Sequence, residues 1–143
     1  PDESKTKAGF LSGVPQEIIS AMKPVKVVTY TNTVQDGGEA DVTYDKVFLL
    51  SLEEIYVSPQ IKGEGEYHEY WKQKSGSTAP LKQYGTYPKM ITYAAENHVS
   101  PQLVRLRSAT RGGASYTWYV TTSGSVTGNG ASWANRFSPA WVI

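Results

Sequence analysis

The chain contains no cysteine, and this absence excludes disulfide bonds, thiolate metal ligands and a cysteine nucleophile. It has no apolar run near the roughly 18 to 20 residues that cross a bilayer as a helix, so we expect no membrane insertion. Histidine occurs only at His68 and His98. No Gly-x-Ser-x-Gly motif accompanies them, and no serine, histidine and carboxylate stand in a pattern typical of a catalytic triad. The residues therefore predict no catalytic residue and no cofactor.

Negative charge is missing from the last third of the chain. All thirteen acidic residues lie at or before Glu96, and the segment from Asn97 to Ile143 has no aspartate, glutamate or lysine. Its arginines include Arg105 and Arg107, which share one face of a predicted strand. We expect these arginines to pair with carboxylates from the first half of the chain. With a net charge of +1 and no lysine in this segment, a nucleic-acid partner is not expected.

Length and composition are typical of one globular domain. The chain has 143 residues, of which 39% are hydrophobic and 19% are charged. Residues 1–9 are mostly polar and charged, so we expect a frayed terminus there, followed by a single domain over residues 10–143. The first residues have neither the basic region nor the apolar stretch of a signal peptide.

Hydrophobic periodicity and turn residues predict short elements along the chain. Ser51 and Glu54 have the spacing of a capping box, which indicates a helix directly after a buried strand. Apolar Met90, Ile91 and Ala94 predict a longer helix. The expected elements are a helix between residues 12 and 24, a strand over 25–31, a turn at 36–38, a strand over 45–50, a helix over 51–56, weak helical character over 66–74, a helix over 87–97, strands over 103–108 and 118–122, a hairpin turn at 123–125 and a closing strand over 137–143.

Aromatic residues are frequent, with ten tyrosines, four tryptophans and three phenylalanines. Trp118 and Val120 share one strand face, so we expect Trp118 in the core, and Trp141 near the end of the chain as well. Trp133 lies in a segment rich in small polar residues that should form a loop. An exposed tryptophan there is costly unless it contacts a partner, so Trp133 is a candidate binding residue. The alternative is that Trp133 packs into the core and anchors the loop.

Short motifs follow one another in a fixed order from Asp45 to the end of the chain. They are DKVFLLS at residues 45–51 followed by two glutamates, LRS at 106–108, WYV at 118–120, GSV at 124–126, and RFSPAWVI at 136–143. This series resembles the DUF6273 domains of gut bacteria and their phages. The resemblance implies a fold like that of C-type lectins and formylglycine-generating enzymes. We therefore expect the α+β class, with a few short helices packed on a small, mostly antiparallel twisted sheet.

Carboxylates cluster with an imidazole at Glu64, Glu66, His68 and Glu69, and such groups are the ligands of many metal sites. The alternative, which we favour, is an ordinary solvated loop and helix face. The acidic motifs by which C-type lectins bind calcium are missing, and formylglycine-generating chemistry needs thiols that the chain does not have. We expect no metal site.

The fold that the resemblance implies also occurs in the variable proteins of diversity-generating retroelements, such as phage tropism determinants. Those proteins carry diversified residues near the C-terminus, between fixed strands, and favour Tyr, Asn, Ser, Trp and Arg there. Residues 110–135 have this composition, in which rigid rings are combined with adaptable polar groups. The expected ligand-binding residues are Thr110, Arg111, Ser115, Tyr116, Asn129, Trp133 and Asn135.

These observations predict a non-catalytic module that binds a protein or glycan receptor on a cell surface. The expected location is extracellular, on a virion tail or a bacterial cell surface, and a retroelement-diversified variable protein is one form of this function. Two alternatives stay open. One is a hydrolase or amidase that uses His68 or His98 with a nearby glutamate, and the other is a structural fibre module that assembles as a homo-oligomer, such as a trimer.

Overall fold

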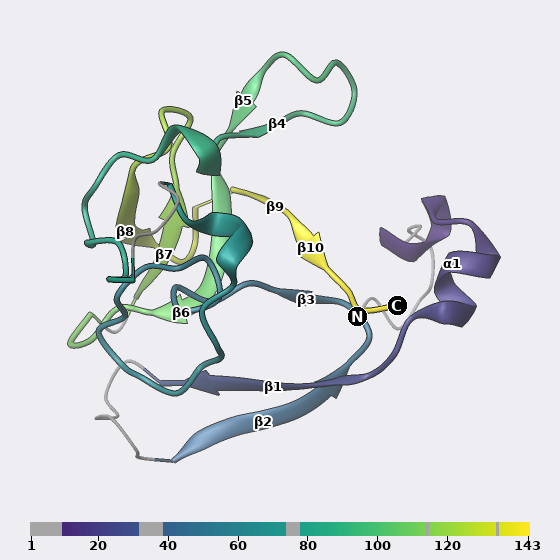
Figure 1. Cartoon of the computed structure of the whole chain (residues 1–143), viewed down its shortest axis with the longest axis horizontal. Helices are drawn as coiled ribbons and strands as arrows, with labels where there is room; N and C mark the ends of the chain where they lie inside the picture. The colour runs from purple at the N-terminus through teal and green to yellow at the C-terminus, as the bar shows by residue number, and fades with distance from the viewer. Residues whose placement is uncertain (1–9, 32–38, 74–77, 114, 134) are drawn as a thin grey trace.

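A long antiparallel ribbon lies along one side of the molecule (Figure 1). The computed structural model describes residues 10–31, 39–73, 78–113, 115–133 and 135–143. Strand β1 (Val25–Tyr30) pairs with β2 (Ala40–Asp45), with Val25 opposite Asp45 and Tyr30 opposite Ala40. The β-branched residues of β1 favour the extended chain, and the strand expected over 25–31 is confirmed. The turn expected at 36–38 and the fraying expected at 1–9 lie outside the described residues.

Two short helical segments precede the ribbon. A 3₁₀ helix covers Phe10–Gly13, and α1 covers Gln16–Ala21 with Pro15 as its N-cap residue. The helix expected between residues 12 and 24 is therefore present but spans only six residues. It leads to a contact with the C-terminus, where the Lys23 amide donates to the Val142 carbonyl at 2.8 Å. No helix within the described parts of the chain has the length and apolar character needed to cross a membrane.

The largest sheet has four strands in the order β8-β7-β6-β9. Its antiparallel part is a meander, and its last strand runs parallel to β6. Alternating burial along β6 places Leu106 on the core face and both neighbouring arginines on the other face. The strands are β6 (Val104–Ala109), β7 (Tyr116–Val120), β8 (Val126–Gly130) and β9 (Arg136–Phe137).

The turn between β7 and β8 forms where the sequence predicts it. Gly124 has a φ of +79°, and a Cβ atom there would lie 2.5 Å from the carbonyl oxygen of Tyr87. Glycine is therefore required both by the backbone conformation and by the close approach of the segment that crosses the turn. The amide of Tyr87 donates to the Gly124 carbonyl at 2.8 Å, which fixes this crossing.

The remaining helices and strands are short. One strand pair joins segments that are distant in sequence, and the other joins the two sides of a single loop. The closing strand expected over 137–143 is reduced to two short strands, β9 and β10. The 3₁₀ helices are Glu69–Trp71 and Pro88–Met90, and the strand pairs are β3 (Phe48–Leu49) with β10 (Pro139–Ala140) and β4 (Thr92–Tyr93) with β5 (Pro101–Gln102).

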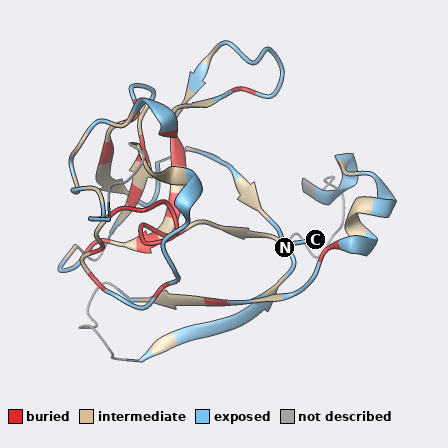
Figure 2. Cartoon of the chain, viewed as in Figure 1, coloured by how far each residue is buried: buried red, intermediate tan, exposed pale blue. Residues whose placement is uncertain are grey.

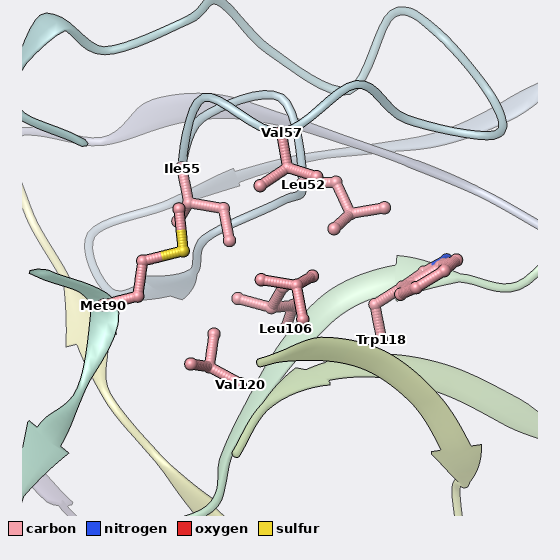
Figure 3. Close-up of a cluster of buried hydrophobic side chains, with 8 residues drawn as sticks. Leu52, Ile55, Val57, Met90, Leu106, Trp118 and Val120 are labelled. Atoms are coloured by element: carbon pink, nitrogen blue, oxygen red, sulfur yellow. The ribbon is translucent and has the colours of Figure 1, made fainter. Parts of the chain in front are cut away.

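The core lies between the four-stranded sheet and the turns that follow β3 (Figures 2 and 3). Trp118, at 0% exposure, and Val120 project from β7 as expected. Trp141 is 37% exposed, so its expected place in the core is wrong. The main cluster is formed by Leu52, Ile55, Val57, Met90, Leu106, Trp118, Val120 and Val126.

The expected α+β class is wrong, and with it the C-type-lectin-like arrangement of helices on one sheet. The described residues are mostly β, because ten short strands form several small sheets and the one α-helix among these residues, α1, spans only six residues. Two expected helices account for most of the difference. Residues 51–56 form consecutive turns, and residues 87–97 form a 3₁₀ turn followed by β4. In the first segment, the amides of Ile55, Tyr56 and Val57 donate to carbonyls four, three and five residues back, so no regular helical pattern continues. In the second, the Ala94 amide donates forward to the Ser100 carbonyl, a bond that closes a hairpin.

Candidate functional site

The turn between β6 and β7, with the first residue of β7, holds four of the residues expected to bind a ligand, namely Thr110, Arg111, Ser115 and Tyr116. The Thr110 amide donates to the Tyr116 carbonyl at 3.2 Å, and the Gly113 amide donates to the Thr110 carbonyl at 3.3 Å. Gly112 has a φ of +75°, and a Cβ atom at Gly113 would lie 2.7 Å from Thr110 Oγ1. The two glycines therefore allow a tight turn, and Arg111 and Tyr116 on its two sides line the same pocket.

A pocket of about 320 Å³ lies against this turn. Arg111 carries the only charge among the described residues that line it, and the backbone amide of Arg111 donates to Gln60 Oε1 at 2.7 Å. Tyr84 and Tyr116 are 67% and 49% exposed at its rim. The lining residues, called the turn pocket below, are Gln60, Tyr84, Thr110, Arg111, Gly112, Gly113, Tyr116 and Gly128.

Tyr84 has an unusual backbone for an exposed aromatic residue. Its φ is +58°, in the left-handed region that L-residues rarely occupy. The conformation is held by its amide, which donates to the Val126 carbonyl at 2.9 Å, and by its ring, whose centroid lies 5.2 Å from that of buried Trp118. Such strain is typical of functional sites. Sequence analysis predicted neither Tyr84 nor Gln60 as a site residue. The glycine that follows Tyr84 indicates a turn there, but it does not indicate a binding residue.

The loop after β8 extends the surface next to the turn pocket. Trp133 is 60% exposed, and its ring lies so close to Gly130 that a Cβ atom there would be 3.2 Å from Trp133 Cδ1. The Trp133 carbonyl accepts from Arg105 Nη2 at 2.9 Å. The exposed Ser115 is tied to the same loop through its carbonyl, which accepts from the Ala131 amide at 2.6 Å. Trp133 is thus exposed on a loop that is held by hydrogen bonds from Arg105 and to Ser115.

The last two expected site residues lie apart from the turn pocket. Asn129 is half-buried in β8, and its Nδ2 donates to the Tyr119 hydroxyl at 3.4 Å. Asn135 lines a different, largely apolar hollow of about 590 Å³ together with the exposed Phe137. Its Nδ2 is buried without a hydrogen-bond partner among the described residues. The structure therefore brings together Thr110, Arg111 and Tyr116, and separates Asn135 from them.

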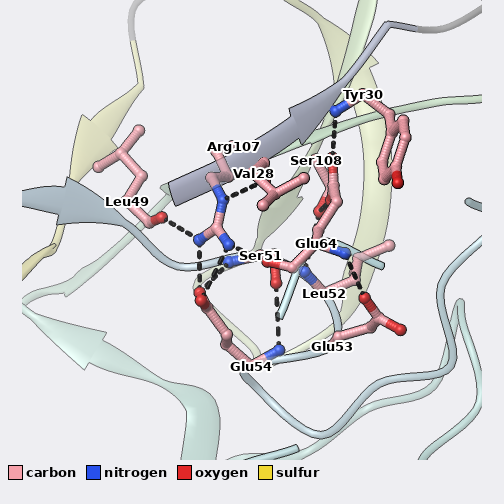
Figure 4. Close-up of polar contacts among 10 residues, drawn as sticks. All are labelled: Val28, Tyr30, Leu49, Ser51, Leu52, Glu53, Glu54, Glu64, Arg107 and Ser108. Atoms are coloured by element: carbon pink, nitrogen blue, oxygen red, sulfur yellow. Dashed lines mark hydrogen bonds and ion pairs between the residues drawn. The ribbon is translucent and has the colours of Figure 1, made fainter. Parts of the chain in front are cut away.

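A buried polar network supports the sheet that carries the turn pocket (Figure 4). Arg107 binds both carboxylate oxygens of Glu54, and it also donates to the carbonyls of Leu49 at 2.6 Å and Val28 at 3.2 Å. The capping box is formed, since the Ser51 amide donates to Glu54 Oε2 at 2.9 Å and the Glu54 amide donates to Ser51 Oγ at 3.2 Å. The expected pairing between the two halves of the chain is thus confirmed at Arg107.

The two other arginines of β6 and β9 behave differently. Arg136 pairs with Glu96 at 3.0 Å, which also confirms the expected pairing, although both side chains are 57% exposed. The hydrogen bonds found for Arg105 go instead to the hydroxyl of Thr117 and to the carbonyls of Gly130 and Trp133. Arg105 therefore anchors the loop after β8 where an ion pair was expected.

Glu64 is the carboxylate at the centre of this network, with an exposed fraction of 3%. Its Oε1 accepts from the Tyr30 amide at 3.0 Å, and its Oε2 accepts from the Ser108 hydroxyl. Burial raises the pKa of the Glu64 carboxyl above the ordinary value of 4.5, although these hydrogen bonds and Arg107 act in the opposite direction.

A pH series tests this interpretation of Glu64. A raised pKa in the folded state means that the contribution of Glu64 to stability is full below the ordinary pKa and is lost as the pH rises through the folded pKa. We expect Glu64→Gln to remove this loss, so that urea unfolding shows the free energy of unfolding of the variant rising relative to that of wild type as the pH is raised from about 4. Glu66→Gln, at an exposed position, serves as the control. A constant difference between Glu64→Gln and wild type across this range would contradict the prediction.

The metal-site and catalytic alternatives receive no geometric support from their residues. His68 and His98 are both exposed, and neither lines the turn pocket. Glu69 forms an ion pair with Lys72 at 2.6 Å, while Glu64 is engaged in the buried network. Within the described ranges, no three His, Asp or Glu side chains are grouped so as to hold a metal ion.

One family profile, described as "Domain of unknown function (DUF6273)", matches residues 6–141. No curated protein and no solved structure matches the chain. The match covers both the ribbon and the sheet that carries the turn pocket.

Proposed function

The chain belongs to the DUF6273 family, and for this member we propose a non-catalytic function, in which the turn pocket and the adjoining Trp133 loop bind a ligand. The observation that carries the proposal is the pair of exposed tyrosines at a polar pocket, Tyr84 and Tyr116. Tyrosine supplies contact area at little cost in conformational entropy, and it binds through both its ring and its hydroxyl.

The frame behind this surface is rigid, which favours binding. Tyr84 lies against buried Trp118, and Tyr116 belongs to a strand paired on both sides. Rings that are already fixed before the ligand arrives lose less freedom on binding, so more of the contact energy appears as affinity.

The proposed partner is a protein or glycan receptor on a cell surface, and the proposed setting is a virion tail or a bacterial surface. We also propose that residues 110–135 are diversified, as in the variable proteins of retroelements. This part of the proposal rests on their content of Tyr, Asn, Ser, Trp and Arg. Nucleotide sequences of the locus from several isolates test it. Substitutions confined to adenine-containing codons of this stretch are expected, and an unvarying stretch would contradict diversification.

Binding itself is tested by alanine substitutions at the two exposed rings. We expect Tyr116→Ala and Trp133→Ala each to weaken binding by about 30-fold or more, as for central aromatic residues of other interfaces. The free energy of unfolding should change by no more than about 0.5 kcal/mol for such exposed positions. The measurement is binding of the labelled domain to printed glycans and proteins and to intact bacterial cells, together with urea unfolding of each variant.

Tyr44→Ala is the matched control, because Tyr44 is 72% exposed on β2, in a separate sheet. It should leave binding unchanged. An equal loss for Tyr44→Ala, or unfolding of the Tyr116 and Trp133 variants, would show that these rings do not form the binding surface.

A further inference from the structure

Strand β2 forms the outer edge of the β1–β2 ribbon, and its far side has no neighbouring strand among the described residues (Figures 1 and 2). The direction of its backbone groups follows from its partner β1. The Val28 carbonyl accepts from Arg107 Nε at 3.2 Å. The Tyr30 amide donates to Glu64 Oε1 at 3.0 Å. These groups of β1 therefore point away from β2.

The free edge of β2 presents a repeating set of backbone donors and acceptors. Antiparallel partners alternate between residues that exchange two hydrogen bonds and residues that exchange none. Ala40 and Val42 lie opposite Tyr30 and Val28, which are of the second kind, and by the same alternation so is the pair that contains Tyr44. The N–H and C=O groups of Ala40, Val42 and Tyr44 therefore point outward. Within the described parts of the chain, they have no hydrogen bond to a residue outside the ribbon.

The outer edge of the four-stranded sheet, at β8, is occupied to a greater extent. The Val126 amide donates to the Gly85 carbonyl at 3.0 Å, and the Val126 carbonyl accepts from the Tyr84 amide at 2.9 Å. The Gly130 amide donates to Asn129 Oδ1 at 2.7 Å. Strand β8 thus offers less backbone to a partner than β2 does. An open edge such as β2 is a template to which an extended segment adds as a further strand.

The side chains of β2 determine which added strand fits. Val42 and Tyr44 are exposed on one face of the ribbon, and Asp41 and Asp45 lie on the other. The exposed Glu39 continues the acidic face just before the strand. No ion pair to these three carboxylates is found within the described residues. Opposite charges on facing strands are stabilising, so this face favours a basic neighbour.

The same carboxylates disfavour a second copy of the chain as the occupant. Outward-pointing residues must face each other, which leaves two antiparallel registers that overlap most of β2. One places Asp41 opposite Asp45 of the second copy, and the other places Glu39 opposite Asp45. Like charges directly opposite are destabilising. The edge therefore favours a different chain of opposite charge.

We infer that the free edge of β2 binds an extended segment of a partner protein in which basic and apolar residues alternate. The backbone of this segment pairs with Ala40, Val42 and Tyr44. Its basic side chains lie opposite Asp41 and Asp45, and its apolar side chains cover the other face. The site lies in a separate sheet from the turn pocket, so the inference goes beyond the proposed receptor binding.

Capped peptides of alternating lysine and valine, and of alternating glutamate and valine, form a matched pair of probes. We expect NMR titration of the domain to give a dissociation constant about tenfold lower for the lysine peptide. Higher salt should weaken that binding, because the carboxylates are exposed. The amide signals of Ala40, Val42 and Tyr44 should shift on binding, since their N–H groups acquire acceptors.

Val42→Pro tests the backbone part of the site. Proline is tolerated on an edge strand where the N–H points away from the sheet, so the ribbon should persist while the outward donor is lost. We expect it to weaken binding of the lysine peptide by about tenfold. Val42→Ala is the matched control, because it shortens the side chain but keeps the donor, and its loss should be much smaller.

Asp41→Asn tests the charge part of the site. It should reduce the preference for the lysine peptide over the glutamate peptide, whereas Glu66→Gln, which removes an exposed carboxylate elsewhere, should leave that preference unchanged. Absence of binding, equal affinity for the two peptides, or equal losses for Val42→Pro and Val42→Ala would overturn the inference.

Two further measurements separate the other outcomes. Light scattering that shows a dimer of the domain, lost in Val42→Pro, would identify a second copy as the occupant and overturn the basic partner. Tyr116→Ala, in the four-stranded sheet, should leave peptide binding unchanged while it weakens receptor binding. Failure of the β2 site and failure of the turn pocket are therefore distinguishable.

Discussion

Replacing Arg107 with methionine is expected to lower the free energy of unfolding by about 3–5 kcal/mol, the range for breaking a buried ion pair from one side. The Arg107 and Glu54 side chains are only 8% and 12% exposed. Methionine keeps most of the length of the side chain but has no donor. It would leave the Glu54 carboxylate buried without its guanidinium and would remove the donors to Leu49 and Val28.

Arg136→Met is the matched control for this prediction. It removes the same side chain from an exposed ion pair, for which the expected change is about 0–1 kcal/mol. Urea unfolding of both variants gives the comparison. The double variant Glu54→Gln with Arg107→Met should recover part of the loss, because it no longer buries an unpaired charge. Equal losses for the two methionine variants would show that the buried pair does not support the fold.

The sequence predicted that arginines of the C-terminal segment would pair with carboxylates from the first half of the chain. An acid-free segment that contains several arginines requires carboxylates from elsewhere in the chain. Arg107 forms an ion pair with Glu54, and Arg136 forms one with Glu96. Which arginine pairs with which carboxylate depends on the fold, and Arg105 shows this. Although it shares a strand face with Arg107, the carbonyls of Gly130 and Trp133 lie beside it and accept its donors.

Local patterns predicted burial better than they predicted helices. Met90 and Ala94 are both 2% exposed, as the helix expected over 87–97 requires, yet the segment is not a helix. The Ala94 amide donates to the Ser100 carbonyl at 2.8 Å, and Asn97 Oδ1 accepts from the amide of Ser100 at 3.0 Å. These bonds turn the chain back on itself as the β4–β5 hairpin. A short apolar period does not distinguish such a hairpin from one helical turn.

The capping box at Ser51 illustrates the same limit. Its two reciprocal hydrogen bonds form as the spacing predicts, but the helix that they would begin does not continue. Tyr56 has a φ of +67°, outside the helical region, so the turns over residues 52–56 end there. Its side chain is buried, at 5% exposure. The Leu52 amide meanwhile donates to Ser108 Oγ at 2.9 Å, a bond to β6 that no local pattern reports.

Only part of the candidate site was predicted from the sequence, because some of its residues come together only through the fold. Composition identified Arg111 and Tyr116, because turn residues rich in rings and polar groups are typical of binding surfaces. It could not identify Tyr84 or Gln60, which come from loops far away in sequence and meet the β6–β7 turn only in the folded chain. Nor could it separate Asn135, whose distance from the turn pocket is set by the parallel pairing of β9 with β6.

Trp118 connects the core to the turn pocket, and its removal should affect both. Trp118→Ala is expected to lower the free energy of unfolding by about 3–5 kcal/mol, the range for a fully buried aromatic side chain. Trp118 has 0% exposure, and its ring packs against that of Tyr84, with 5.2 Å between the ring centroids. Without this support, Tyr84 loses the contact that holds its strained backbone, so ligand binding should weaken even under conditions where the variant stays folded.

Trp133→Ala and Trp118→Phe separate these effects. Trp133 is 60% exposed, so its loss should change stability by no more than about 0.5 kcal/mol while it weakens receptor binding. Trp118→Phe keeps an aromatic ring under Tyr84, and it sacrifices no observed hydrogen bond because Trp118 Nε1 has no partner among the described residues. We therefore expect urea unfolding to place it between wild type and Trp118→Ala, with ligand binding largely kept. If Trp118→Phe lost binding as completely as Trp118→Ala, a ring beneath Tyr84 would not be enough to preserve the pocket, and the role given to Trp118 would be wrong.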